Sequence, residues 1–148
     1  MNIRKALTLQ TVTVSLPGST KQEVIEALVD LACTGGKVKD RATALEAVLA
    51  REARMTTGLE HGVAIPHGKT DAVDELVAAV GITPEPVDFA ALDGNPCRIF
   101  VMTLSSIHRT GPHIQFLSEI SRLLKSADVR DRLLAARDTR TLLSLLQG

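Results

Sequence analysis

The chain has 148 residues, and its 17 Lys and Arg side chains balance 17 Asp and Glu side chains, so the formal net charge is zero. Domains that bind nucleic acid are visibly basic, and binders of single strands stack bases on aromatic side chains. With three Phe and no Tyr or Trp, this chain offers little surface for stacking, and we expect no nucleic-acid partner. The length predicts a single domain, which we assign to residues 1–148.

The cysteines and the hydropathy pattern bear on the cell compartment. Cys33 and Cys97 are too few for a disulfide framework and do not form a CxxC pair. They are typical of reduced thiols in a cytoplasmic protein. No segment approaches the roughly 18 apolar residues of a membrane span, and residues 1–10 lack the apolar centre of a signal peptide. We therefore expect a cytoplasmic location and no membrane insertion.

The first elements of the chain are a strand and two helices. Residues 12–16 alternate apolar and polar side chains, which predicts a short strand. Ser19 opens a capping-box pattern before a helix that should end at Gly35-Gly36. Asp40 is suited to cap the next helix.

Strand patterns dominate the middle of the chain. Residues 62–65 are short, apolar and β-branched, and we expect Pro66-His67-Gly68 to end that strand. Residues 76–82 and 98–104 have strand length, with a turn at 93–96 between them. The C-terminal part changes to helical spacing.

A helix is predicted from Pro112, and Asp128 and Thr139 can cap two final helices. The alternation of helix and strand patterns favours an α/β or mixed α+β fold. Charge is unevenly spread, because residues 1–97 carry 9 basic and 13 acidic side chains whereas residues 98–148 carry 8 and 4. This indicates either two differently charged helical surfaces or a basic region that favours an anion.

His67 is the first candidate for chemistry. It follows an apolar strand in the sequence Ala-Ile-Pro-His-Gly, and sites in open α/β sheets gather at the carboxyl ends of strands. Pro66 fixes the backbone and Gly68, which has no side chain, allows another group to approach closely. Such surroundings suit a nucleophile or a metal ligand. The alternative is a loop histidine without a functional role.

His113 and Arg51 could complete such a site. His113 lies in the first turn of the helix that starts at Pro112, where free N–H groups and the helix dipole favour an anion. It could instead be a histidine at the core edge. Arg51 could offer a guanidinium fork to phosphate oxygens, or simply complement a helix C-terminus.

Together the three residues favour a phosphoryl site without metal or cofactor. A neutral imidazole can accept a phosphoryl group, whose oxygens need positive or N–H-bearing neighbours. Gly35-Gly36-Lys37 lacks the spacing of a Walker A loop, so another protein is a better phosphoryl donor than ATP.

The stretch from Arg51 to Gly68, with Thr57-Gly58 and Gly62-Val-Ala-Ile-Pro-His-Gly, resembles the signature of enzyme IIA domains of the bacterial phosphotransferase system (PTS). The similar class is the fructose/mannitol type, which includes nitrogen-regulatory IIA proteins. Residues 113–117 resemble the helix with that family's second histidine, and the resemblance extends from about Leu7 to Leu146.

The resemblance implies a mixed β-sheet flanked by helices on both faces. His67 would accept a phosphoryl group from the phosphohistidine of the carrier HPr or its nitrogen-branch counterpart. It would pass the group to a cysteine of an enzyme IIB domain or hold it as a regulatory mark. His113 would stabilise the group by hydrogen bonding, and Arg51 would assist electrostatically.

The sequence departs from the family pattern at two places. His61 stands where the family more often has Asn, and residues 104–109 lack a proline expected after that strand. No IIB or IIC domain is evident, and Cys97 precedes no phosphate-cradling loop.

Three alternatives remain open at this point. One is a regulatory protein that docks onto transporters or kinases according to its phosphorylation. Another is a zinc site built from histidines, for which the spacing of His108 and His113 is unfavourable. The last is a scaffold that has lost phosphotransfer.

Overall fold

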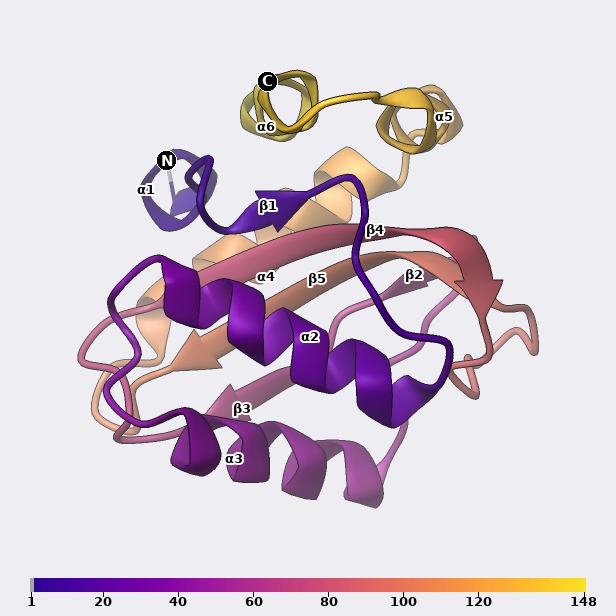
Figure 1. Cartoon of the computed structure of the whole chain (residues 1–148). Helices are drawn as coiled ribbons and strands as arrows, with labels where there is room; N and C mark the ends of the chain where they lie inside the picture. The colour runs from indigo at the N-terminus through magenta and orange to yellow at the C-terminus, as the bar shows by residue number, and fades with distance from the viewer. Residues whose placement is uncertain (1) are drawn as a thin grey trace.

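The computed structural model describes residues 2–148, and Figure 1 shows the arrangement of its elements. In chain order they are α1 (Asn2–Ala6), β1 (Val12–Thr13), α2 (Lys21–Thr34), α3 (Arg41–Arg54), β2 (Val63–Ala64), β3 (His67–Lys69), β4 (Val77–Val87), β5 (Cys97–Ser105), α4 (Gly111–Leu124), α5 (Ala127–Ala135) and α6 (Thr139–Gln147).

One mixed sheet with the order β1-β4-β5-β2 organises the fold, and β3 also pairs with β5. The long strands β4 and β5 are antiparallel, whereas the short strands run parallel to their neighbours. Helices α2 and α3 cover one face of the sheet, and α1, α4, α5 and α6 lie on the other (Figure 1). The expected α/β fold with helices on both faces is confirmed.

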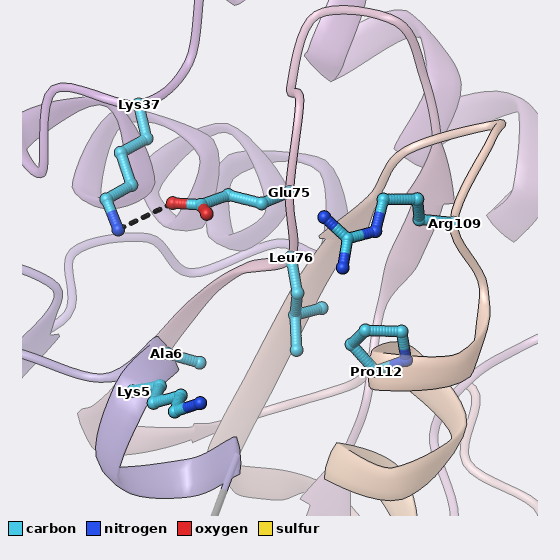
Figure 2. A pocket seen from close by; sticks show the side chains of 7 residues that line it. All are labelled: Lys5, Ala6, Lys37, Glu75, Leu76, Arg109 and Pro112. Carbon is cyan, nitrogen blue, oxygen red and sulfur yellow. Dashed lines mark ion pairs between the residues drawn. The ribbon is translucent and has the colours of Figure 1, made fainter.

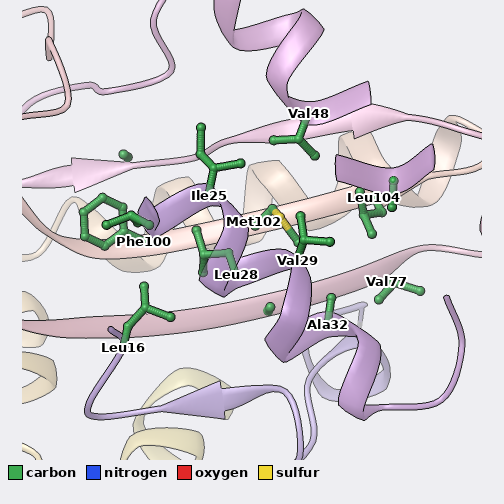
Figure 3. Close-up of a cluster of buried hydrophobic side chains, with 14 of the residues drawn as sticks. Leu16, Ile25, Leu28, Val29, Ala32, Val48, Val77, Phe100, Met102 and Leu104 are labelled. Carbon is green, nitrogen blue, oxygen red and sulfur yellow. The ribbon is translucent and has the colours of Figure 1, made fainter. Parts of the chain in front are cut away.

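The alternation of side chains along β5 divides the core in two. Phe100, Met102 and Leu104 point toward α2 and α3 (Figure 3), while Ile99 and Val101 belong to the cluster under α4. All five are buried. Thr103 continues the second set, so its side chain lies on the α4 face of the sheet.

Strand β2 and strand β3 form one interrupted edge strand. Ala64 pairs with Phe100 and His67 pairs with Thr103, so both partner numbers differ by the same amount and the register is kept across Ile65-Pro66. The carbonyl of Pro66 still accepts the N–H of Thr103 at 3.1 Å. The predicted strand does end before Pro66, but the prediction missed that pairing resumes at His67, because proline removes only one donor from the ladder.

Three predicted caps are displaced by one or two residues. Thr20, not Ser19, caps α2 by accepting the N–H of Glu23, whose carboxylate accepts in return from Ser19. The caps of α5 and α6 are Ser126 and Asp138 instead of Asp128 and Thr139. In each case a neighbouring Ser, Thr or Asp offers an equivalent oxygen, so residue type alone does not fix the position.

The other predicted boundaries of helices and strands agree with the structure to different extents. The cap at Asp40 and the helix end before Gly35 are confirmed, whereas the strand predicted over residues 12–16 is β1 alone, with one further bond from Leu16 N–H to the sheet. Helix α1 had no counterpart in the predicted elements. Of the predicted domain, Met1 lies outside the described residues.

Candidate functional site

His67 opens β3 and is oriented by its own backbone. Its Nδ1 lies 3.0 Å from the carbonyl oxygen of Ile65. A carbonyl can only accept, so Nδ1 carries the proton and donates. In the neutral ring the lone pair is then on Nε2. The side chain is half-buried, which leaves an oriented nucleophilic nitrogen at the protein surface.

His113 faces His67 from the first turn of α4. The two ring centroids are 5.5 Å apart and the rings are inclined by 45°. Burial lowers the pKa of His113, and positive charge nearby, from His67 when it is protonated and from Lys69, acts in the same direction. The ring is therefore held in the neutral form, in which one nitrogen can donate and the other can accept a hydrogen bond.

Thr103 is a site residue that the sequence analysis missed. Its side-chain oxygen lies 2.9 Å from Nε2 of His113, and Thr103 is only 1% exposed. It also pairs directly with His67 in the β3–β5 ladder. The signal was present: in the apolar run Ile-Phe-Val-Met-Thr-Leu the threonine breaks the pattern, and a buried hydroxyl needs a partner.

The register therefore brings both predicted histidines together on one face of the sheet. His67 and Thr103 are paired neighbours, and their side chains share the α4 face. Thr103 then links this strand pair to His113 on the helix. On the opposite face, a Cβ at Gly68 would lie 3.0 Å from the backbone of Ala47 and Val48, so β3 and α3 are in close approach.

Arg51 lies on the next turn of α3 after that approach. Its Nη1 donates to the backbone carbonyl of Met55 at 2.7 Å, which satisfies an end of the helix. This geometry matches the structural role considered from sequence. A role toward a phosphoryl group would require the guanidinium to swing from this bond or to use its remaining donors.

The departures from the family pattern have local explanations. His61 adopts a left-handed backbone with φ of 60°, a conformation in which Asn is also enriched. Residues 106–109 form a tight turn, with the N–H of Arg109 donating to the carbonyl of Ser106 at 3.2 Å. This turn leads into α4 and leaves Ile107 exposed beside the site helix.

A cavity of about 430 Å³ adjoins the start of α4 (Figure 2). Its charged lining consists of Lys5, Lys37, Arg109 and Glu75, and Lys37 forms an ion pair with Glu75 at 2.8 Å. The lining carries a net positive charge of 3 − 1 = +2. Pro112, the chain neighbour of His113, forms part of the wall, and the net positive lining favours an anion in this cavity, which neither His67 nor His113 lines.

The two cysteines are free. Burial raises the pKa of the Cys97 thiol to about 11, and the acidic Asp93 and Asp88 add to the effect. Since the thiolate is the nucleophilic form, this side chain is unsuited to carry a transferred group, in agreement with the sequence argument.

The structure of residues 2–148 bears on a metal site and on membrane insertion. In this part of the chain, no three His, Cys, Asp or Glu side chains are grouped so that they could hold a metal ion. The zinc alternative therefore has no ligand set among them. Every helix of the same range is too short or too polar to span a bilayer.

Comparisons with known proteins define the class. Residues 5–148 match the family model of the phosphoenolpyruvate-dependent sugar phosphotransferase system, EIIA 2. The chain belongs to this family of phosphocarriers, as the motif around His67 indicated. The fold, a sheet with helices on both faces, is also that of solved IIA domains.

Particular relatives come from both branches of the family. The fructose-specific EIIA component of Haloferax volcanii is 41% identical over 138 residues, which cover 93% of this chain and 90% of that protein. A nitrogen regulatory protein of Pseudomonas aeruginosa is 37% identical over 123 residues, covering 83% and 80%. The crystal structure of IIA-Ntr from Neisseria meningitidis superposes with a TM-score of 0.90 at 28% identity, covering 97% of this chain and 98% of that one.

The mannitol branch also supplies a complex. The IIA mannitol domain of Escherichia coli, solved together with phosphorylated enzyme IIB, has a TM-score of 0.81 and is 25% identical, covering 96% of this chain and 97% of that chain. The fold and family predictions are thus confirmed, whereas the roles of His67, His113 and Arg51 stay predictions.

Proposed function

We propose that His67 is the phosphoryl acceptor of this EIIA protein and that Nε2 is the atom that bonds to phosphorus. The observation that carries the proposal is the bond from Nδ1–H to the carbonyl of Ile65, because it leaves the lone pair on Nε2. In the transfer, the P–N bond of a donor phosphohistidine breaks as the P–Nε2 bond forms. The donor imidazole leaves with the electron pair of its old bond.

His113 stabilises the transferring group in this mechanism. When the Thr103 hydroxyl donates to Nε2 of His113, the ring proton resides on Nδ1 and can be offered to a phosphoryl oxygen. Before transfer, the lowered pKa of His113 favours its neutral form, in which the ring has one N–H to donate. Arg51 adds positive charge from the end of α3.

The donor is HPr or its nitrogen-branch counterpart, and the recipient is a cysteine on an enzyme IIB domain. Onward transfer breaks P–Nε2 and forms a P–S bond with the thiolate. Ile107 and Ile114, which are 51% and 65% exposed on either side of His113 in the chain, offer apolar contacts to such protein partners. The free cysteines fit a cytoplasmic carrier.

A regulatory use of the same phosphohistidine is the second candidate. The similarity to the nitrogen regulatory protein of Pseudomonas aeruginosa favours it. Two negative charges gained at His67 would change the surface that Ile107 and Ile114 present to a transporter or kinase. The same phosphorylation step serves both functions.

The test is intact-mass measurement after incubation with phosphoenolpyruvate, enzyme I and HPr, or with their nitrogen-branch counterparts. The wild type should gain one acid-labile phosphate, and the His67→Ala variant should gain none. His108→Ala, which alters an exposed loop histidine, is the matched control and should label fully. Full labelling of His67→Ala would overturn the assignment.

A further inference from the structure

Glu52 is a buried carboxylate that the proposed mechanism does not use. It lies in the last turn of α3 and is 8% exposed. One oxygen accepts the backbone N–H of Thr57 at 2.7 Å, and the other accepts the Thr57 hydroxyl. Lys21 forms an ion pair with it at 2.7 Å. Buried carboxylates need such partners. Here three donors converge on the two carboxylate oxygens of Glu52.

Lys21 extends this set of contacts to a second helix and a third segment. It is the first residue of α2, and its ammonium also donates to the hydroxyl of Thr56 at 3.3 Å. The Thr56 hydroxyl in turn donates to the carbonyl of Phe89 at 2.9 Å, and the Lys21 ammonium lies 4.9 Å from the Phe89 ring centroid. Residues 56 and 57 are thereby attached to α2, α3 and the segment after β4.

The attachment leads directly to His67 through two further bonds. The carbonyl of Thr57 accepts the N–H of Ile65 at 3.0 Å. The carbonyl of the same Ile65 is the group that accepts Nδ1–H of His67, also at 3.0 Å. A continuous series of short contacts therefore runs from Glu52 through Thr57 and Ile65 to the imidazole.

Stability alone is a weak explanation for this arrangement. A buried ion pair gains little over apolar side chains of similar volume, because both charges lose their hydration. A carboxylate that accepts from three donors does, however, fix the position and direction of each donor group. Here the fixed element is the loop at Thr57, which holds Ile65 through its N–H, and the carbonyl of Ile65 selects the protonated nitrogen of His67.

We propose that Glu52 is a positioning residue, which with Lys21 holds Thr57 so that the Ile65 carbonyl keeps the proton of His67 on Nδ1 and the lone pair on Nε2. The inference rests on the proposed function of His67 as phosphoryl acceptor. Glu52 contacts neither imidazole and acts through the loop.

The test compares Glu52→Gln with Glu46→Gln. The first substitution keeps the shape of the side chain but removes its charge and half of its acceptor capacity, whereas Glu46 is an exposed residue of the same helix. Two measurements are made on folded protein: kcat and KM for phosphoryl uptake from phospho-HPr, and the ¹⁵N shifts of the His67 ring. Glu52→Gln should lower kcat about 10- to 100-fold with little change in KM. Its ring spectrum should move toward a mixture of both tautomers, and Glu46→Gln should match the wild type.

Thr57 supplies a second pair of variants, since Thr57→Val replaces the hydroxyl with a methyl group whereas Thr57→Ser keeps the hydroxyl. Thr57→Val should reproduce the kinetic and spectral change in weaker form, and Thr57→Ser should restore both. This pair keeps the proposal testable if Glu52→Gln does not fold. Folded Glu52→Gln or Thr57→Val protein with wild-type kcat and a wild-type ring spectrum would overturn it.

The two proposals fail in different ways. If wild-type protein takes up no phosphate while Glu52→Gln still shifts the His67 tautomer, the acceptor assignment fails and the positioning inference stands. If the wild type is phosphorylated and the variants are indistinguishable from Glu46→Gln in both measurements, only the positioning inference fails.

Discussion

The two histidines of the site are held by different layers of the molecule. His67 belongs to strand β3, whose backbone approaches that of α3 closely at Gly68. A main-chain carbonyl, that of Ile65, orients the imidazole. His113 belongs to α4 on the other side of the sheet and is held by one buried hydroxyl, that of Thr103. The first is fixed by steric contact and backbone bonds, the second by a single side-chain bond. Disturbing either layer should therefore have separable effects.

Filling the narrow contact on the α3 side should have the largest effect. In Gly68→Ala the new methyl group would lie 3.0 Å from backbone atoms of Ala47 and Val48, which cannot rotate away. We expect a loss of about 2–3 kcal/mol in the free energy of unfolding, measured by urea denaturation, together with slower phosphoryl uptake. Gly111→Ala, whose Cβ meets nothing within 4 Å, is the control. Equal stability of the two variants would refute the close approach.

Removing the hydroxyl on the α4 side should cost less and should leave the His67 tautomer intact. Thr103→Val keeps the shape but leaves Nε2 of His113 without its partner. The expected loss is about 1–2 kcal/mol in urea denaturation, with slower phosphoryl transfer and an unchanged acceptor. Thr103→Ser should recover most of both. Complete loss of labelling in Thr103→Val would mean that the two layers are not separable.

The smallest effect concerns pH. Because the pKa of His113 is lowered in the fold, the unfolded chain binds that proton more readily. Stability should therefore fall as pH drops below the ordinary histidine value of 6.5, until the folded form is protonated as well. The slope of unfolding free energy against pH in this window should be shallower in His113→Gln. The exposed-loop variant His108→Gln serves as reference, and an identical slope in all three proteins would contradict the shift.

The sequence predicted those features that depend on local patterns. Periodicity and turn residues were enough to predict β4, β5 and the helix that begins near Pro112. The motif was enough to associate His67 with a histidine at the start of that helix. Cap positions near Ser19 and Asp128 were missed because adjacent residues could serve equally well.

The remaining features depend on contacts between distant segments. The resumption of the edge strand at His67 requires β5 as a partner, and no pattern in residues 63–69 contains it. The roles of Thr103 and of Glu52 depend on hydrogen bonds across the fold. Residue type indicates only that a buried hydroxyl or carboxylate must have a partner, and the fold determines which partner it is.

The bonds that place Ile65 have a second consequence, for self-association. The segment of residues 57–59 covers the outer side of β2. The N–H of Leu59 donates to the carbonyl of Val63, and the N–H of Ile65 donates to the carbonyl of Thr57. An uncovered sheet margin is a template onto which another chain can add a strand and begin an aggregate. The loop that orients the imidazole thus also shields the margin of the sheet, and a protein in which it detached would lose solubility together with its ability to accept a phosphoryl group.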